Sequence, residues 1–120
     1  MPPFSLREEP DGLIVRIDDA AAMNDFRSNS FRDSLYETVL NQDGIRVALD
    51  LGVVDFLSSS GIAILVGMKR RIDAQQGKLI LFQVQPIVND ALRVTHLTQY
   101  FTFAADEPGA LALLRPLPAL

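Results

Sequence analysis

The chain of 120 residues has no cysteine, and no stretch of it is apolar for long. Without cysteine it can form neither a disulfide framework nor a thiolate metal site, which fits a reducing compartment. No run approaches the ~20 consecutive apolar residues that a bilayer-spanning helix needs. The first residues also lack the basic and apolar regions of a secretory signal. We therefore expect a soluble, cytoplasmic protein without direct membrane insertion.

The chain also has few basic residues. The chain has 11 Lys and Arg against 15 Asp and Glu, a net charge of −4, and its basic residues are scattered apart from residues 69–71. Because nucleic-acid-binding surfaces are usually basic, we expect no nucleic-acid partner. The remaining composition, 48% hydrophobic and 22% charged, is ordinary for a globular protein. The length predicts a single domain over residues 1–120 with a real hydrophobic core.

The hydrophobic pattern predicts an N-terminal hairpin followed by alternating helices and strands. Apolar pieces flank turn residues 10–12, which indicates the hairpin. Phe31, Leu35 and Val39 recur at helical spacing. Further strands are predicted at 45–51, 78–84 and 98–103, and helices at about 25–41, 60–76, 86–95 and 107–114.

Several residues are expected to set the limits of these elements. Asn24, Ser28 or Ser30 is expected to cap the first helix. Gly44 is expected to end it in the left-handed conformation, and Gly77 to close the second. Asp106 is predicted to cap the last helix. The final residues, 116–120, are expected to form a frayed tail.

The order of these elements predicts an α/β fold. Strand–helix–strand units wind right-handed and make neighbouring strands parallel. With the hairpin added, the fold is a small mixed β-sheet of four to five strands with helices packed mainly on one face. In open α/β sheets the functional site usually lies beyond the carboxyl ends of the strands. Three consecutive serines, Ser58, Ser59 and Ser60, follow strand 45–51 and precede Gly61 at that edge.

Helix capping and nucleophilic catalysis are two interpretations of the serine run. An N-cap serine is worth about 1 kcal/mol, but it accounts for one hydroxyl of the three. A nucleophile elbow needs glycine two residues before the serine, where Leu57 stands before Ser59. A serine hydrolase also needs a base, and His96, the only histidine, is predicted near a helix end. Hydrolase chemistry is therefore disfavoured.

Phosphate binding, metal binding and phosphorylation are the other interpretations. Gly61, Gly67 and Lys69 miss the spacing of a phosphate-binding loop. Asp50 and Asp55 are isolated carboxylates and predict no metal site. A phosphoryl group on a serine would meet the free N–H groups at the helix start and add nearly two negative charges there. That helix is apolar on almost every side in its first half, which is more apolar surface than one sheet-facing side needs. Either neighbouring helices or a partner protein covers this apolar surplus.

Residues 47–84, VALDLGVVDFLSSSGIAILVGMKRRIDAQQGKLILFQV, resemble the core of a STAS domain, the fold of bacterial anti-sigma-factor antagonists. The family signature joins a strand ending in Asp-Leu to an Asp-Ser-Ser-Gly run that opens a helix. Here Asp50 and Leu51 precede the serine run and Gly61 at that distance. Residues 86–114 are similar to the C-terminal third of the family, and the resemblance covers about residues 10–115.

The resemblance implies a regulator of transcription rather than an enzyme, without a cofactor. By position, Ser59 corresponds to the family's phosphorylated serine. Ser58 stands where the family has aspartate and is the alternative phosphoacceptor. The implied partner is an anti-sigma factor that is also a serine kinase of the histidine-kinase-like ATPase type. Phosphorylation would end that interaction.

The expected docking surface combines the serine loop, the start of its helix and part of the loop at residues 19–25. Its partner-binding residues are Phe56, Leu57, Ser58, Ser60, Gly61, Ile62 and Leu65. Two alternatives stay open. One is a STAS domain that is not phosphorylated and serves as a scaffold or as the cytoplasmic subunit of a lipid transporter. The other is a small enzyme or ligand-binding protein on the same fold.

Overall fold

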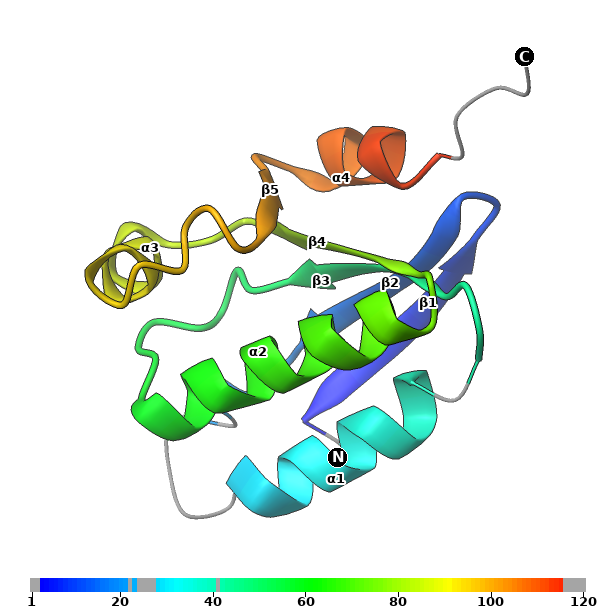
Figure 1. Ribbon diagram of the computed structural model, residues 1–120. Coiled ribbons are helices and arrows are strands. Elements are labelled where there is room, and N and C mark those ends of the chain that lie inside the picture. The colour runs from blue at the N-terminus through cyan, green and yellow to red at the C-terminus, as the bar shows by residue number, and fades with distance from the viewer. Residues whose placement is uncertain (1–2, 22, 24–27, 41, 116–120) are drawn as a thin grey trace.

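The computed structural model describes residues 3–21, 23, 28–40 and 42–115, and its centre is one five-stranded sheet (Figure 1). The strand order is β1-β2-β3-β4-β5. β1 and β2 form the predicted antiparallel hairpin, and β2 to β5 pair in parallel, so the predicted mixed sheet is confirmed. The strands are β1 (Phe4–Glu9), β2 (Gly12–Ile17), β3 (Arg46–Asp50), β4 (Lys78–Phe82) and β5 (Thr102–Ala104).

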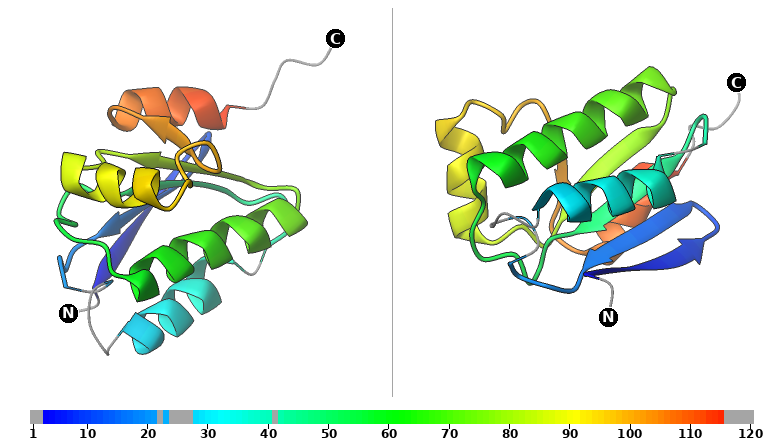
Figure 2. Two further views of the ribbon diagram at one scale, coloured as in Figure 1. Left: turned by 60° about the vertical axis from the view of Figure 1, so that its left-hand side comes forward. Right: turned by 90° about the horizontal axis from the view of Figure 1, so that it is seen from below.

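The described helices cover the two faces of the sheet unequally, as predicted (Figures 1 and 2). Three helices pack into the larger core, and one packs on the opposite face. Strand residues divide between the cores with a period of two, so Leu49 and Leu81 face the larger core while Ala48 and Ile80 face the smaller one. The helices are α1 (Ser28–Val39), α2 (Ser59–Ala74) and α3 (Pro86–Val94) on the first side and α4 (Glu107–Leu114) on the other.

The predicted element limits hold in part: β5 covers Thr102–Ala104 rather than the predicted residues 98–103. Asp106 caps α4, because its Oδ1 accepts a hydrogen bond from the backbone N–H of Gly109 at 2.9 Å. Gly44 has φ +71°, the left-handed conformation expected of it, but it does not end α1: the helix ends at Val39, and the N–H of Gly44 donates to the carbonyl oxygen of Gln75 at 2.7 Å. Of the candidate caps of the first helix, Asn24 lies outside the described residues, whereas Ser30 lies inside α1 and is not its cap. The predicted tail, 116–120, also lies outside the described residues.

The end of α2 differs from the prediction. The left-handed residue there is Gln76, with φ +60°, and not Gly77. Glycine is required at position 77 for another reason: a Cβ atom there would lie 2.2 Å from the carbonyl oxygen of Ile45. Gly77 therefore allows the chain after α2 to pass close to the segment that leads into β3.

Neighbouring elements bury most of the apolar surplus of α2. On one side, the Tyr36 hydroxyl of α1 donates a 2.7 Å hydrogen bond to the carbonyl oxygen of Ile64. Gly67 makes room for it, because a Cβ atom at this position would lie 2.5 Å from the Tyr36 oxygen. Ile62 and Val66 are partly buried against the larger core. Much of the apolar surface in the middle of α2 is thus covered within the chain.

Candidate functional site

The serine run begins α2 at the carboxyl edge of the parallel strands, after a loop over residues 51–58. Leu51 and Val54 of this loop are fully buried, and the backbone N–H of Val54 donates to the carbonyl oxygen of Leu51 at 3.0 Å. Asp55 and Phe56 between these anchors and the helix are exposed. Buried side chains therefore hold the loop to the core while its tip faces solvent.

Ser58 is the N-cap of α2, with φ −76° and ψ 172°. Its Oγ accepts a 3.2 Å hydrogen bond from the backbone N–H of Gly61 and donates a 2.9 Å hydrogen bond to the carbonyl oxygen of Met23. One serine therefore caps the helix, as predicted, and the helix begins at Ser59 rather than at Ser60. The Ser58 hydroxyl is engaged both as a donor and as an acceptor.

Ser59 and Ser60, the first two helical residues, are exposed. Within the part of the chain that the structure describes, their hydroxyls have no hydrogen-bond partner, and neither have their backbone N–H groups. These N–H groups lie at the positive end of the 16-residue helix α2. The site thus offers a free hydroxyl beside donors that favour a bound anion.

Gly61 allows the loop between β2 and α1 to lie against the first turn of α2. A Cβ atom on this glycine would lie 2.5 Å from the carbonyl oxygen of Met23 and 2.8 Å from Cδ1 of Leu57. Met23 itself is fully buried. Part of the loop expected at residues 19–25 therefore does lie beside the serine run, although residues 22, 24 and 25 are outside the described residues.

Three residues of the predicted docking surface are wrong as direct contacts, since Leu57, Gly61 and Leu65 are buried. They recur every four residues, so all three lie on the inward side of the helix and its approach. Phe56 is 53% exposed and Ser60 is exposed, while Ile62 is partly buried. The two leucines thus support the surface from the core.

Sequence reasoning missed further exposed apolar residues at the same edge. Val53 precedes Phe56 in the loop and is 43% exposed. In α3, Ile87 and Val94 are 53% and 69% exposed. Figures 1 and 2 show α3 beside the loop, and Nε2 of Gln85 joins the two segments by donating a 2.8 Å hydrogen bond to the carbonyl oxygen of Gly52. The seven-residue spacing of Ile87 and Val94 could have revealed a shared face.

The other chemistries considered for the serines find little support in the geometry. His96 follows α3 with φ +61°, and within the described part of the chain no hydrogen bond connects its ring to a serine. Asp50 accepts a 2.8 Å hydrogen bond from the backbone N–H of Gly52, and the described residues contain no cluster of three His, Asp or Glu suited to a metal ion. No helix among the described residues combines the length and apolarity needed to cross a membrane.

Comparison with known proteins agrees with the resemblance of the sequence. The family model of the STAS domain matches residues 4–110. The Bordetella bronchiseptica protein BtrV, whose name assigns it to the anti-sigma factor antagonists, is 29% identical over 70 residues, which cover 58% of this chain and 60% of that protein. The matched stretch is therefore less than two thirds of that relative.

Solved structures agree on the fold. A STAS domain protein from Planctomyces limnophilus superimposes with a TM-score of 0.81 at 22% identity, covering 92% of this chain and 97% of that one. A Thermotoga maritima protein named for anti-sigma factor antagonism gives 0.81 at 18% identity, covering 94% and 95%. At these identities the likeness concerns the architecture.

Proposed function

The chain belongs to the STAS domain family, and from this premise we propose that it is a regulatory module of the anti-sigma-factor antagonist type. It binds an anti-sigma factor that is also a serine kinase of the histidine-kinase-like ATPase type, and it catalyses nothing itself. Transcription regulation by this route would take place in the cytoplasm. The observation that carries the proposal is the free, exposed hydroxyl of Ser59 at the start of α2, beside an exposed phenylalanine.

The docking surface that we propose consists of the exposed loop tip and the first turn of α2. Its apolar part is Val53, Phe56 and the exposed portion of Ile62, and its polar part is Ser59 and Ser60. Fully burying a phenylalanine against a partner is worth about 1.5–3 kcal/mol, so Phe56 is its main apolar contact. The hydroxyls can be covered without the cost of burying a charge.

Phosphorylation of Ser59 acts on this surface through charge. A phosphoserine carries about −1.5 to −2 charges at neutral pH, and the exposed Asp55 lies four residues earlier, in the loop that leads into α2. In the free protein the phosphate can accept hydrogen bonds from the unpaired N–H groups of the first turn. In the complex it would have to lose its water, so phosphorylation favours the separated state.

Ser59 rather than Ser58 is the acceptor that we propose. Modification of Ser58 would replace the proton that its hydroxyl donates to the carbonyl oxygen of Met23, and would therefore break that hydrogen bond. Modification of Ser59 breaks no hydrogen bond that the structure describes. The serine in place of the family's aspartate therefore keeps the capping role and leaves the next hydroxyl free.

Phosphorylation followed by mass spectrometry tests the proposal. We expect candidate histidine-kinase-like serine kinases, with ATP and magnesium, to place one phosphate on Ser59. Ser59→Ala should abolish the product, whereas Ser58→Ala and Ser60→Ala should retain it. In titration calorimetry Ser59→Asp should bind the kinase at least about tenfold more weakly than the wild type, since a charge is buried unpaired. Ser34→Asp adds the same charge on exposed α1 and should bind normally.

A STAS domain that is not phosphorylated remains the second candidate, either as a scaffold or as the cytoplasmic subunit of a lipid transporter. The observation in its favour is Ser58 in the place of the family's aspartate. Equal affinity of wild type and Ser59→Asp for a partner, together with no phosphate from any tested kinase, would contradict the switch. That result would leave the docking surface in place and favour the scaffold.

A further inference from the structure

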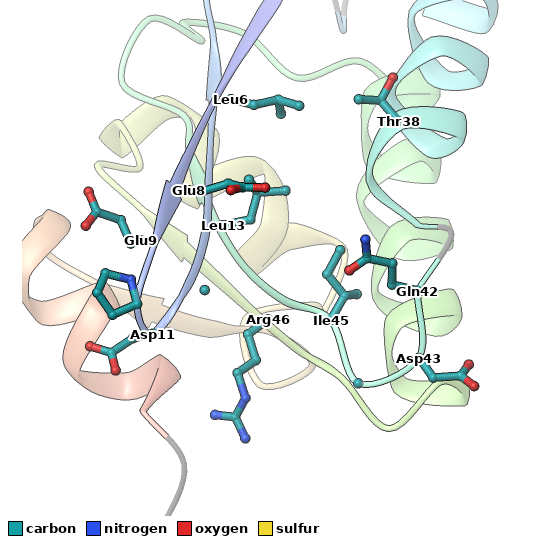
Figure 3. A pocket seen from close by; sticks show the side chains of 13 residues that line it. Leu6, Glu8, Glu9, Asp11, Leu13, Thr38, Gln42, Asp43, Ile45 and Arg46 are labelled. Atoms are coloured by element: carbon teal, nitrogen blue, oxygen red, sulfur yellow. The ribbon is translucent and has the colours of Figure 1, made fainter.

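A second surface lies at the opposite edge of the sheet, near the amino ends of β2 and β3. The hairpin, the end of α1 and the loop that follows it enclose an open cavity of about 410 Å³. Figure 3 shows Leu6, Glu8 and Leu13 projecting from the hairpin toward Thr38 and Ile45 on the other side. We call this cavity the hairpin groove.

The hairpin groove contains an apolar strip among polar side chains, because α1 covers only part of β1. Near the start of β1, the ring of Phe4 packs against Phe31 of α1 with centroids 6.0 Å apart and is 6% exposed. Leu6, on the same face two residues later, is 43% exposed. Leu13 and Ile45 are partly buried beside it. The described chain covers this apolar strip only in part, and Leu6 is its most exposed residue.

The groove carries unbalanced negative charge at its centre and rim. Figure 3 places the carboxylate of Glu8 beside Leu13, and Asp43 stands at the outer rim. Both carboxylates are exposed, and neither forms a hydrogen bond or an ion pair in the part of the chain that the structure describes. A free carboxylate between apolar side chains attracts a cationic group that also brings an apolar neighbour.

No basic side chain of the groove compensates this charge. Among the described residues that line it, Arg46 is the only basic one, and its guanidinium donates instead to the carbonyl oxygen of Leu114 at the end of α4. The last turn of α1 contains no basic residue, so the carbonyl end of this helix adds partial negative charge nearby. The local charge therefore disfavours nucleic acids and acidic proteins as occupants.

We propose that the hairpin groove binds a basic, apolar segment of a protein partner. An apolar side chain of the segment packs on Leu6, Leu13 and Ile45, and a neighbouring lysine or arginine pairs with Glu8. A purely apolar ligand would leave the carboxylate desolvated and unpaired, which is costly. This surface and Ser59 lie at opposite edges of the sheet, so the segment can bind regardless of the state of Ser59.

Binding of labelled peptides to the purified protein, followed by fluorescence anisotropy, tests this proposal. The probe is a peptide of alternating leucine and lysine, and two matched peptides replace every leucine with serine or every lysine with glutamate. We expect only the leucine–lysine peptide to bind, with an affinity that falls as salt is added. Glu8→Lys should weaken binding about tenfold through loss of one ion pair and new repulsion. Leu6→Ser should also weaken binding, because it removes an apolar contact with the leucine side chains of the peptide.

Two further variants separate this site from general charge effects and from the serine surface. Asp55→Lys changes the net charge as Glu8→Lys does but lies at the other edge, and it should leave binding unchanged. Ser59→Asp should also leave it unchanged. Absence of binding, equal binding of the serine–lysine peptide, or an equal loss in Asp55→Lys would overturn the proposal. None of these results bears on phosphorylation of Ser59.

Discussion

The hydroxyl of Ser58 donates a 2.9 Å hydrogen bond to the carbonyl oxygen of Met23, 35 positions earlier in the chain. The hydroxyl oxygen of Ser58 also accepts a hydrogen bond from the backbone N–H of Gly61 and thereby caps α2. An aspartate, which the STAS signature has at this position, can accept from Gly61 but has no proton to donate to Met23. Serine in place of the family's aspartate therefore keeps the cap and adds a hydrogen bond between α2 and the β2–α1 loop.

Removing this hydroxyl should lower stability in two separable parts. Ser58→Ala loses the cap and the bond to Met23, and we expect its free energy of unfolding to fall by about 1–2 kcal/mol. Ser58→Asp keeps an acceptor for the cap and loses only the hydrogen bond to Met23. Its free energy of unfolding should therefore lie between those of the wild type and Ser58→Ala. Urea unfolding measures all three. A Ser58→Ala variant as stable as the wild type would contradict the assigned role.

The glycine at the third position of α2 should tolerate no side chain. In Gly61→Ala the new methyl group would lie 2.5 Å from the carbonyl oxygen of Met23, so we expect a loss of about 1–3 kcal/mol. Gly109 is the matched control, because it also follows an N-cap by three residues and donates to its side chain. There the nearest atom is Oδ1 of Asp106 at 3.1 Å, on a side chain that can shift.

Thermal unfolding of both variants provides the measurement. Gly109→Ala should change the melting temperature little, because the higher helix propensity of alanine offsets the closer contact. Gly61→Ala should melt well below the wild type. If both substitutions had the same effect, the close approach of the β2–α1 loop would not be what requires glycine at position 61.

The exposed and buried apolar residues around the serines should behave in opposite ways. Phe56→Ala removes a side chain that is 53% exposed, so stability should change little while affinity for the partner falls. Leu65→Ala empties a fully buried position and should cost about 2–5 kcal/mol of stability. Calorimetric titration with the partner, paired with urea unfolding, distinguishes the two. Unchanged affinity in a folded Phe56→Ala would remove this residue from the docking surface.

Tyr36 should make the protein less stable at alkaline pH. Burial raises the pKa of its hydroxyl above the ordinary value near 10, although the nearby charges of Arg71 and Arg32 oppose this shift. Because the raised pKa belongs to the folded state, the unfolded chain loses its proton first as pH rises. The contribution of Tyr36 to the free energy of unfolding is complete below pH about 10, and it is lost as pH rises through the folded-state pKa.

Unfolding measured between neutral pH and pH about 11 tests this linkage. Tyr36→Phe should be about 1 kcal/mol less stable at neutral pH, because it lacks the hydrogen bond to Ile64, and its stability should fall less steeply at high pH. Parallel profiles for wild type and Tyr36→Phe would show that Tyr36 does not titrate differently on unfolding.

Local pattern was sufficient for most of the architecture. Alternation in β3, helical spacing at Phe31 and Leu35, and turn residues between β1 and β2 predicted elements that the structure contains. Their order then predicted parallel pairing, because right-handed crossovers leave few arrangements. The ends of the helices were predicted less well where several neighbouring residues could adopt the left-handed conformation. At the end of α2 it is Gln76, and not Gly77, that adopts it.

The site itself was predicted only in part. The position of Ser59 at the start of a helix followed from sequence, because a cap and an apolar helix are local signals. The exposure of individual residues did not follow. Leu57 and Leu65 were expected at the surface and are buried, whereas Ile87 and Val94 are exposed although apolar. Which apolar residues face solvent depends on neighbours that are distant in the chain.

The sequence by itself therefore determined the order of strands and helices, the mixed sheet and the placing of three hydroxyls at one helix start. Only the tertiary structure decided how these hydroxyls differ. Met23, brought to α2 by the loop after β2, engages Ser58 and leaves Ser59 free. Period and propensity act over a few residues, whereas a contact between positions 23 and 58 exists only once the sheet and α2 are assembled.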